Sequence, residues 1–83
     1  LNQNYPNPFN PSTKISFTLP QSTNVKLSVF NMLGEKLAEL LNEVKSAGTY
    51  DINFDGSELS SGMYLYRLEA DGFISTKKMT LIK

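Results

Sequence analysis

Asp51, Asn53 and Asp55 are the polar side chains whose spacing most suggests chemistry, because calcium accepts carboxylate and amide oxygens as ligands. The spacing resembles the start of an EF-hand loop, but the twelfth position counted from Asp51 is Gly62, where such a loop carries a glutamate. As a catalytic pair, Asp51 and Asp55 would lie about 13 Å apart on one face of a strand, too far for concerted acid–base work. We therefore interpret them as solvent-facing strand residues, and we expect no metal site and no catalytic site.

Nucleophilic catalysis also lacks its usual side chains. The 83 residues include no histidine and no cysteine, so there is no imidazole base, no thiol nucleophile and no disulfide. Histidine and cysteine are also the two protein ligands that zinc prefers, so a zinc site lacks its usual residues. We predict that the protein is not an enzyme and that it requires no cofactor.

The charges balance, with eight Lys and Arg against eight Asp and Glu. A net charge of zero argues against binding to nucleic acid or to an anionic membrane surface. No apolar run approaches the roughly 20 residues that a membrane-spanning helix needs, so we expect no membrane insertion. Lys77, Lys78 and Lys83 form a small basic cluster, whose simplest interpretation is a solvated strand edge that discourages aggregation.

The length corresponds to one small domain with a modest core. The chain begins with Leu1 and opens into polar sequence without a basic and then apolar leader, so we expect no signal peptide here. We interpret the chain as a module taken from a longer protein.

The first quarter of the chain contains all four prolines, Pro6, Pro8, Pro11 and Pro20. Their density excludes a helix or a central strand over Asn4–Ser12. The segment is either a free linker or a strap docked on the domain, and its two aromatic residues, Tyr5 and Phe9, favour docking. We expect residues 1–13 to form this strap, joined to an upstream passenger, and residues 14–83 to form a β-sandwich.

Apolar residues then recur at every second position, which predicts half-buried strands. The expected strands cover Ile15–Leu19, Val25–Phe30, Tyr50–Phe54, Met63–Ala70 and Phe73–Ile82. Asp71-Gly72 is a strong signal for a two-residue hairpin turn. That turn would place Leu68 opposite Ser75, Tyr66 opposite Lys77 and Tyr64 opposite Met79. The predicted core face of this hairpin consists of Tyr64, Tyr66, Leu68, Met79 and Leu81. Short strands joined by turns indicate an all-β sandwich.

The stretch Glu35–Ala47 is ambiguous. Leu37, Leu40, Leu41 and Val44 follow the spacing of an amphipathic helix, and Gly48 lies where a helix would stop. Like charges four residues apart, such as Glu35 and Glu39, count mildly against a helix. The local pattern favours a helix.

Several segments, taken together and in order, carry a family resemblance. They are Asn4–Thr13, the positions Ile15, Phe17, Leu19 and Pro20, then Val25–Gly34, Ala47–Tyr50, Leu59–Tyr64 and Lys78–Lys83. This combination resembles the type A C-terminal sorting domain of the bacterial type IX secretion system, over essentially the whole chain. The resemblance implies an immunoglobulin-like or fibronectin-III-like antiparallel β-sandwich of about six to seven strands. It also implies a strand rather than a helix over Glu35–Val44, and we adopt that expectation.

The resemblance implies a signal rather than a catalyst. In such proteins an N-terminal signal delivers the parent to the periplasm, and the folded C-terminal domain is then read by the type IX translocon. A sortase-like surface peptidase commonly removes the domain, and the passenger is secreted or attached to surface lipopolysaccharide. The residues that we expect to form the recognised region are Tyr5, Pro6, Asn7, Pro8, Phe9, Gly48, Gly62, Tyr64, Lys78 and Lys83.

Within that region we expect the hairpin Met63–Lys83 to provide the recognised surface through its edge backbone groups and lysines. Gly48 and Gly62 are interpreted as turn positions that need unusual φ angles, and Tyr64 as a core aromatic. The family often carries Trp where Phe54 stands, and Phe keeps an aromatic anchor there.

Two other functions remain open from the sequence. The strap and Gly48–Phe54 also resemble the immunoglobulin-like domain of flagellar hook-capping proteins, which would imply a structural role, although Lys78–Lys83 favours sorting. A carbohydrate-binding accessory module would need exposed aromatic side chains. Tryptophan is absent and the four tyrosines fit core or hairpin positions, which weakens that alternative.

Overall fold

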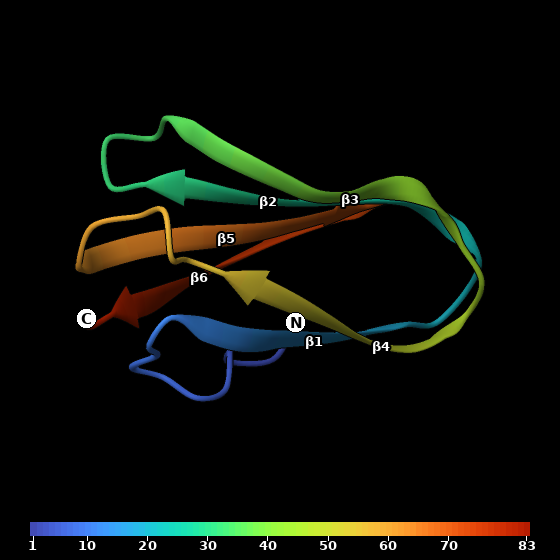
Figure 1. Ribbon diagram of the computed structural model, residues 1–83. Coiled ribbons are helices and arrows are strands. Elements are labelled where there is room, and N and C mark those ends of the chain that lie inside the picture. The colour runs from blue at the N-terminus through green and yellow to red at the C-terminus, as the bar shows by residue number, and fades with distance from the viewer.

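The computed structural model describes all 83 residues and contains six β-strands and no helix (Figure 1). The strands are β1 (Ser12–Leu19), β2 (Thr23–Asn31), β3 (Lys36–Lys45), β4 (Gly48–Asp55), β5 (Gly62–Ala70) and β6 (Phe73–Leu81). β1 and β4 form a two-stranded antiparallel sheet, and the other four form a second antiparallel sheet in the order β3-β2-β5-β6. The two sheets pack as a sandwich (Figure 1), which confirms the expected all-β, immunoglobulin-like fold. The structure therefore has no helix that could span a bilayer.

The core lies between the two sheets and follows the period-two pattern of the sequence. Ile15, Phe17 and Leu19 on β1 are fully buried, while the residues between them face outward. The complete buried apolar cluster consists of Phe9, Ile15, Phe17, Leu19, Val25, Leu27, Val29, Phe54, Tyr64, Tyr66, Leu68, Met79 and Leu81. Each large apolar side chain contributes roughly 1.5–3 kcal/mol by leaving water, so this cluster is the main stabilising element of a small domain.

The hairpin of β5 and β6 forms as predicted. Leu68 pairs with Ser75, Tyr66 with Lys77 and Tyr64 with Met79. Gly72 adopts a φ of +89° in the tight turn, a conformation that glycine reaches without a steric penalty. The five residues assigned to the core face of the hairpin are all buried. Leu59 in the preceding loop packs against the core as an apolar anchor.

The helix favoured by the local pattern over Glu35–Ala47 is wrong, and the strand implied by the family resemblance is confirmed. Two β-bulges in the pairing of β3 with β2 allow the adjacent Leu40 and Leu41 to pack against the core. Leu37 and Val44 are instead 40% and 68% exposed. The four residues therefore share no buried face, and backbone pairing with β2 outweighs their helical spacing.

Candidate functional site

The strap is hydrogen bonded along the outer edge of β1. The backbone nitrogen of Tyr5 donates to the carbonyl oxygen of Lys14 at 3.0 Å, and the nitrogen of Lys14 donates to the carbonyl of Tyr5 at 2.9 Å. Nearer the N-terminus, the nitrogen of Asn2 donates to the carbonyl of Ser16 at 2.9 Å. The strap thus occupies edge backbone groups that β1 would otherwise leave unpaired.

The same strap also pairs with β6, which is an edge strand of the other sheet. The nitrogen of Phe9 donates to the carbonyl of Thr80, and the nitrogen of Ile82 donates to the carbonyl of Phe9, both at 2.9 Å. The Asn7 side chain accepts a bond of 3.0 Å from the nitrogen of Thr80. The Gln3 side chain donates to the carbonyl of Lys78 at 2.8 Å. The strap therefore bridges the edge of β1 and the edge of β6.

Two buried polar side chains hold the bend of the strap. Asn4 and Thr13 are only 2% and 3% exposed. The Asn4 amide donates to the Thr13 hydroxyl at 3.0 Å and to the carbonyl of Pro6 at 3.2 Å. The Thr13 hydroxyl in turn donates to the carbonyl of Pro6 at 2.9 Å. Because proline-rich backbone is rich in acceptors and poor in donors, these side chains supply the donors that the strap lacks.

A third contact joins the strap to the middle of the four-stranded sheet. The hydroxyl of Tyr66 accepts a hydrogen bond from the nitrogen of Asn4 and donates one to the carbonyl of Asn2, each at 2.8 Å. Burial raises the pKa of the Tyr66 hydroxyl above its ordinary value, and the hydrogen bond from Asn4 opposes part of that increase. Tyr66 therefore remains protonated at neutral pH and can donate to Asn2.

The two aromatic residues of the strap behave differently. Phe9 docks as expected: it is 1% exposed and meets Phe54 edge to face, with ring centroids 6.2 Å apart. Gly56 lies against Phe9 and leaves room for its ring. The expectation that Tyr5 also docks is wrong, because Tyr5 is 81% exposed. The backbone of Tyr5 pairs with β1 and directs its side chain into solvent.

The expected recognition residues gather near the junction of the strap and β6, apart from Gly48. Gly62 lies opposite Leu81, and Tyr64 is buried with its hydroxyl donating to the carbonyl of Ser60 at 2.6 Å. Lys78 is exposed on β6. The ammonium of Lys83 donates to the carbonyl of Ser57 at 2.6 Å.

Gly48 stands apart from this group, at the start of β4 opposite Leu19, which is the end of β1 distant from the strap. Its φ is +151°, and that of Gly62 is +154°. Both angles lie in the region that favours glycine, as expected. Gly48 therefore contributes a turn conformation, and the structure places it far from the other nine residues.

Sequence reasoning missed several residues that build the site, namely Gln3, Asn4, Thr13, Tyr66 and Thr80. Asn4 and Thr13 carried a usable signal, because a run of proline carbonyls requires side-chain donors nearby. Tyr66 was assigned to the core, but a buried tyrosine hydroxyl also requires partners. Only its position opposite the strap identifies those partners.

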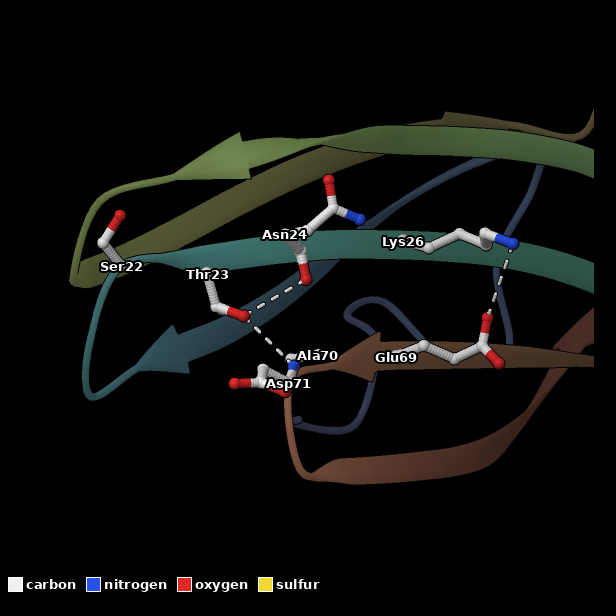
Figure 2. Close-up of a pocket in the computed structure, with 7 residues that line it drawn as sticks. All are labelled: Ser22, Thr23, Asn24, Lys26, Glu69, Ala70 and Asp71. Carbon is white, nitrogen blue, oxygen red and sulfur yellow. Dashed lines mark hydrogen bonds and ion pairs between the residues drawn. The ribbon is translucent and has the colours of Figure 1, made fainter.

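The structure also has a surface depression at the opposite end, with a volume of about 500 Å³ (Figure 2). Its lining residues are Ser22, Thr23, Asn24, Lys26, Glu69, Ala70 and Asp71. Their polar groups largely satisfy one another: Thr23 accepts from the nitrogen of Asp71 at 3.1 Å, and Lys26 lies 4.0 Å from Glu69. These contacts hold the β5–β6 turn to the start of β2, and we assign the depression a structural role.

The carboxylates considered at the outset also have local partners. Both Asp51 and Asp55 are exposed on β4. Asp51 accepts a hydrogen bond of 2.6 Å from the hydroxyl of Ser16, and Asp55 accepts one of 2.9 Å from the nitrogen of Ser57. They are surface residues that support the strand and its following turn.

Comparison with known proteins agrees with this geometry. No curated protein matches the chain. A family model described as the secretion system C-terminal sorting domain matches residues 3–83. The match includes the strap from Gln3 onward and all six strands, so it covers the site together with the fold. A strap bonded to both sheets, a six-stranded sandwich and this match lead to one conclusion: the chain belongs to the family of type IX secretion system C-terminal sorting domains, which act as secretion signals and not as enzymes.

Proposed function

We propose that this domain is a folded address that the type IX translocon reads when it moves a parent protein from the periplasm across the outer membrane. The recognised region is the junction of the strap with the β5–β6 hairpin. The parent is then secreted or retained at the cell surface. The family match supports the sorting role itself.

The observation that carries the proposal is the pairing of Phe9 with β6. Its nitrogen and carbonyl bond to Thr80 and Ile82, so residues from both ends of the domain form one surface. That surface exists only in the folded chain. A translocon that reads it would distinguish a folded domain from an unfolded one without reading a linear peptide.

The ten expected residues take two kinds of role, structural support and direct contact with the translocon. Phe9, Gly62 and Tyr64 are structural, because they are buried or hold a special backbone conformation. Tyr5 and Lys78 are exposed and would contact the translocon. The strap is shaped by Pro6, Asn7 and Pro8. Lys83 connects the C-terminal tail to the loop before β5, and Gly48 shapes a turn distant from the strap.

The strap also suggests where a surface peptidase would act. Asn2, Asn4, Tyr5 and Phe9 are held by backbone hydrogen bonds, and proteases require an extended, accessible segment. We place the cleaved bond upstream of Asn2, between the passenger and the strap. Removal there would leave the domain folded and would free the passenger for secretion or attachment to surface lipopolysaccharide.

The direct test fuses these 83 residues to a periplasmic reporter in a host that secretes by the type IX route. We expect the reporter outside the cell or on its surface, and a folded fusion retained in the periplasm would overturn the proposal. Deletion of Lys78–Lys83 should abolish export because it removes the partners of Phe9. Export of the truncated fusion at the full level would contradict the role of the junction.

A substitution that preserves the fold separates contact from stability. Tyr5→Ala removes a side chain that is 81% exposed, and Gln21→Ala removes an exposed side chain from the turn between β1 and β2, at the end of the sandwich distant from the strap. We expect Tyr5→Ala to reduce export and Gln21→Ala to leave it unchanged. Equal export of the two variants would exclude Tyr5 from the recognised region.

The alternative functions have less support. A polysaccharide-binding face would need several exposed aromatic rings side by side, whereas Tyr5 is the one aromatic residue with more than half of its surface exposed. A hook-cap-like structural role predicts self-association of the purified domain in place of reporter export.

A further inference from the structure

The outer face of the four-stranded sheet carries side chains in rows, because the strands are in register. In one row Phe30 of β2 and Leu65 of β5 are neighbours at the centre. Lys36 of β3 lies beside Phe30, and Lys78 of β6 lies beside Leu65. Phe30 and Leu65 are half-buried, and the two lysines are exposed. The row is thus an apolar centre with a cation at each end.

Arg67 belongs to the next row and leans over this centre. Its guanidinium lies 4.4 Å from the centroid of the Phe30 ring, which fixes the charge above an apolar surface. The nearest carboxylate oxygen, on Glu69, is 3.9 Å from its Nε atom, which is buried and has no hydrogen-bond partner, while 38% of the Arg67 side chain remains exposed to a partner. The neighbouring Ser28 hydroxyl is buried and also has no partner. Lys78 makes no ion pair.

The outer face of the two-stranded sheet has a different composition. Its outward residues are Ser12, Lys14, Ser16, Thr18, Thr49, Asp51, Asn53 and Asp55, with two carboxylates, one cation and no apolar side chain. The four-stranded sheet presents four cations on its outer face (Lys26, Lys36, Arg67 and Lys78) against two carboxylates (Glu39 and Glu69). A chain with no net charge therefore separates a cationic, partly apolar face from an acidic, polar one.

The strap limits what β6 can offer through its backbone. The outward backbone groups of Thr80 and the carbonyl of Lys78 are already bonded to the strap. A partner strand could not add to that part of the edge without displacing the strap. Near the junction, side chains on the outer face remain as the available contacts.

We propose that the outer face of the four-stranded sheet, centred on Phe30, Leu65, Arg67 and Lys78, is the docking surface for an acidic protein partner. We call it the Arg67 face. It rests on the proposed function, in which this partner is a component of the secretion machinery. A carboxylate of the partner bonds to Arg67 and Lys78, and an apolar side chain covers Phe30 and Leu65.

The chemistry favours a protein over an anionic lipid. Phe30 and Leu65 are half-buried in the sheet, so only part of their apolar surface is available to enter a bilayer. Glu39 and Glu69 lie among the cations and pair with Lys36 and Lys26, so the face does not present the uniform positive charge that favours anionic lipid phosphates. A protein surface can place its own cations opposite those two carboxylates, whereas a lipid surface of one sign cannot.

The test compares two double variants of the reporter fusion with the same change in net charge. Arg67→Gln with Lys78→Gln removes two cations from the Arg67 face. Thr18→Glu with Gln21→Glu adds two carboxylates at exposed positions, near the end of β1 and in the turn that follows it. We expect at least a tenfold loss of export for the first variant and unchanged export for the second. Thermal unfolding of each purified domain checks that both are folded.

Three results separate the possible outcomes. Equal export of the two folded variants would overturn the Arg67 face while leaving the sorting function intact, because the unmodified fusion would still be exported. The Arg67→Gln substitution could itself destabilise the domain. In that case the single variant Lys78→Gln, at an exposed position without an ion pair, should still reduce export several-fold. Binding of the purified domain to vesicles of equal phosphatidylglycerol and phosphatidylcholine, lost in Arg67→Gln with Lys78→Gln, would replace the protein partner with a lipid and contradict the proposal.

Discussion

The hydroxyl oxygen of Tyr66 lies 2.8 Å from the backbone nitrogen of Asn4, although the two residues are 62 positions apart in the chain. Tyr66 belongs to a central strand of the four-stranded sheet, and Asn4 belongs to the strap that pairs with β1 of the other sheet. One phenol therefore connects both layers of the sandwich to the strap. Because the contact is buried, it is stronger than an equivalent surface contact would be.

Tyr66→Phe should destabilise the domain by about 1–3 kcal/mol, because the nitrogen of Asn4 and the carbonyl of Asn2 would lose their partner. The free energy of unfolding in urea measures the loss, and hydrogen exchange of the Asn4 amide locates it in the strap. Tyr5→Phe is the matched control, since its exposed hydroxyl has no such role. Unchanged exchange at Asn4 in Tyr66→Phe would show that the strap is held without this bond.

Alkaline pH should weaken the domain through the same side chain. Burial raises the pKa of Tyr66 in the folded state above the value of about 10 that an exposed tyrosine has. The folded chain therefore keeps a proton that the unfolded chain loses, so stability is complete below about pH 10 and declines as the pH rises through the folded-state pKa. Urea unfolding at pH 8 to 11 should show a steeper decline for the wild type than for Tyr66→Phe. If the free energy of unfolding fell equally with pH in the wild type and in Tyr66→Phe, Tyr66 would not be the source of the alkaline weakening.

Phe9→Ala should cost about 3–5 kcal/mol, the range for truncation of a buried Phe in a core. The ring is 1% exposed and contacts Phe54, and its loss would also loosen the pairing of the strap with β6. Tyr5→Ala should change the free energy of unfolding by less than about 0.5 kcal/mol, since the side chain is exposed. If chemical denaturation gave the same decrease in the free energy of unfolding for Phe9→Ala and Tyr5→Ala, the two aromatic side chains would contribute equally to stability.

Gly56→Ala tests the close packing where the strap crosses the end of β4. An added Cβ would lie 3.2 Å from Phe9, 3.3 Å from Leu81 and 3.3 Å from the carbonyl of Pro11. Overpacking of this kind typically costs about 1–3 kcal/mol. Ser57→Ala, one residue away and exposed, should be nearly neutral. A Gly56→Ala domain as stable as wild type in thermal unfolding would show that the strap can shift to accept the methyl group.

The strands could be predicted because their apolar residues alternate with few exceptions. Ile15, Phe17 and Leu19 are buried as the period-two pattern requires, and Asp71-Gly72 fixes the register of β5 with β6. β3 was harder to predict from the sequence, because bulges place both Leu40 and Leu41 against the core and disrupt the alternation of apolar residues. There the family resemblance corrected the local pattern.

The strap could be predicted only in part, because its contacts are with residues far away in the chain. Its proline content excluded regular structure, and its aromatic content indicated docking. Composition does not distinguish which aromatic docks: Phe9 is buried and Tyr5 is exposed because the backbone at Tyr5 follows the edge of β1. The partners of Asn4 are Thr13 and Tyr66, and only the fold brings them within reach.

The bond between Thr80 and Asn7 spans 73 positions, and this has a consequence for the order of events during synthesis. The strap leaves the ribosome long before β6, so the backbone of Phe9 has no hydrogen-bond partner until the final strand has emerged. Contacts of such long range also form slowly, which delays completion of the fold. A chain terminated before β6 could still pair its strap with β1, but the contacts of Asn7 and Phe9 with β6 would be missing. Pairing of the strap with β6 therefore requires that translation has reached the last strand, and a shortened product would lack the junction that the proposed sorting function uses.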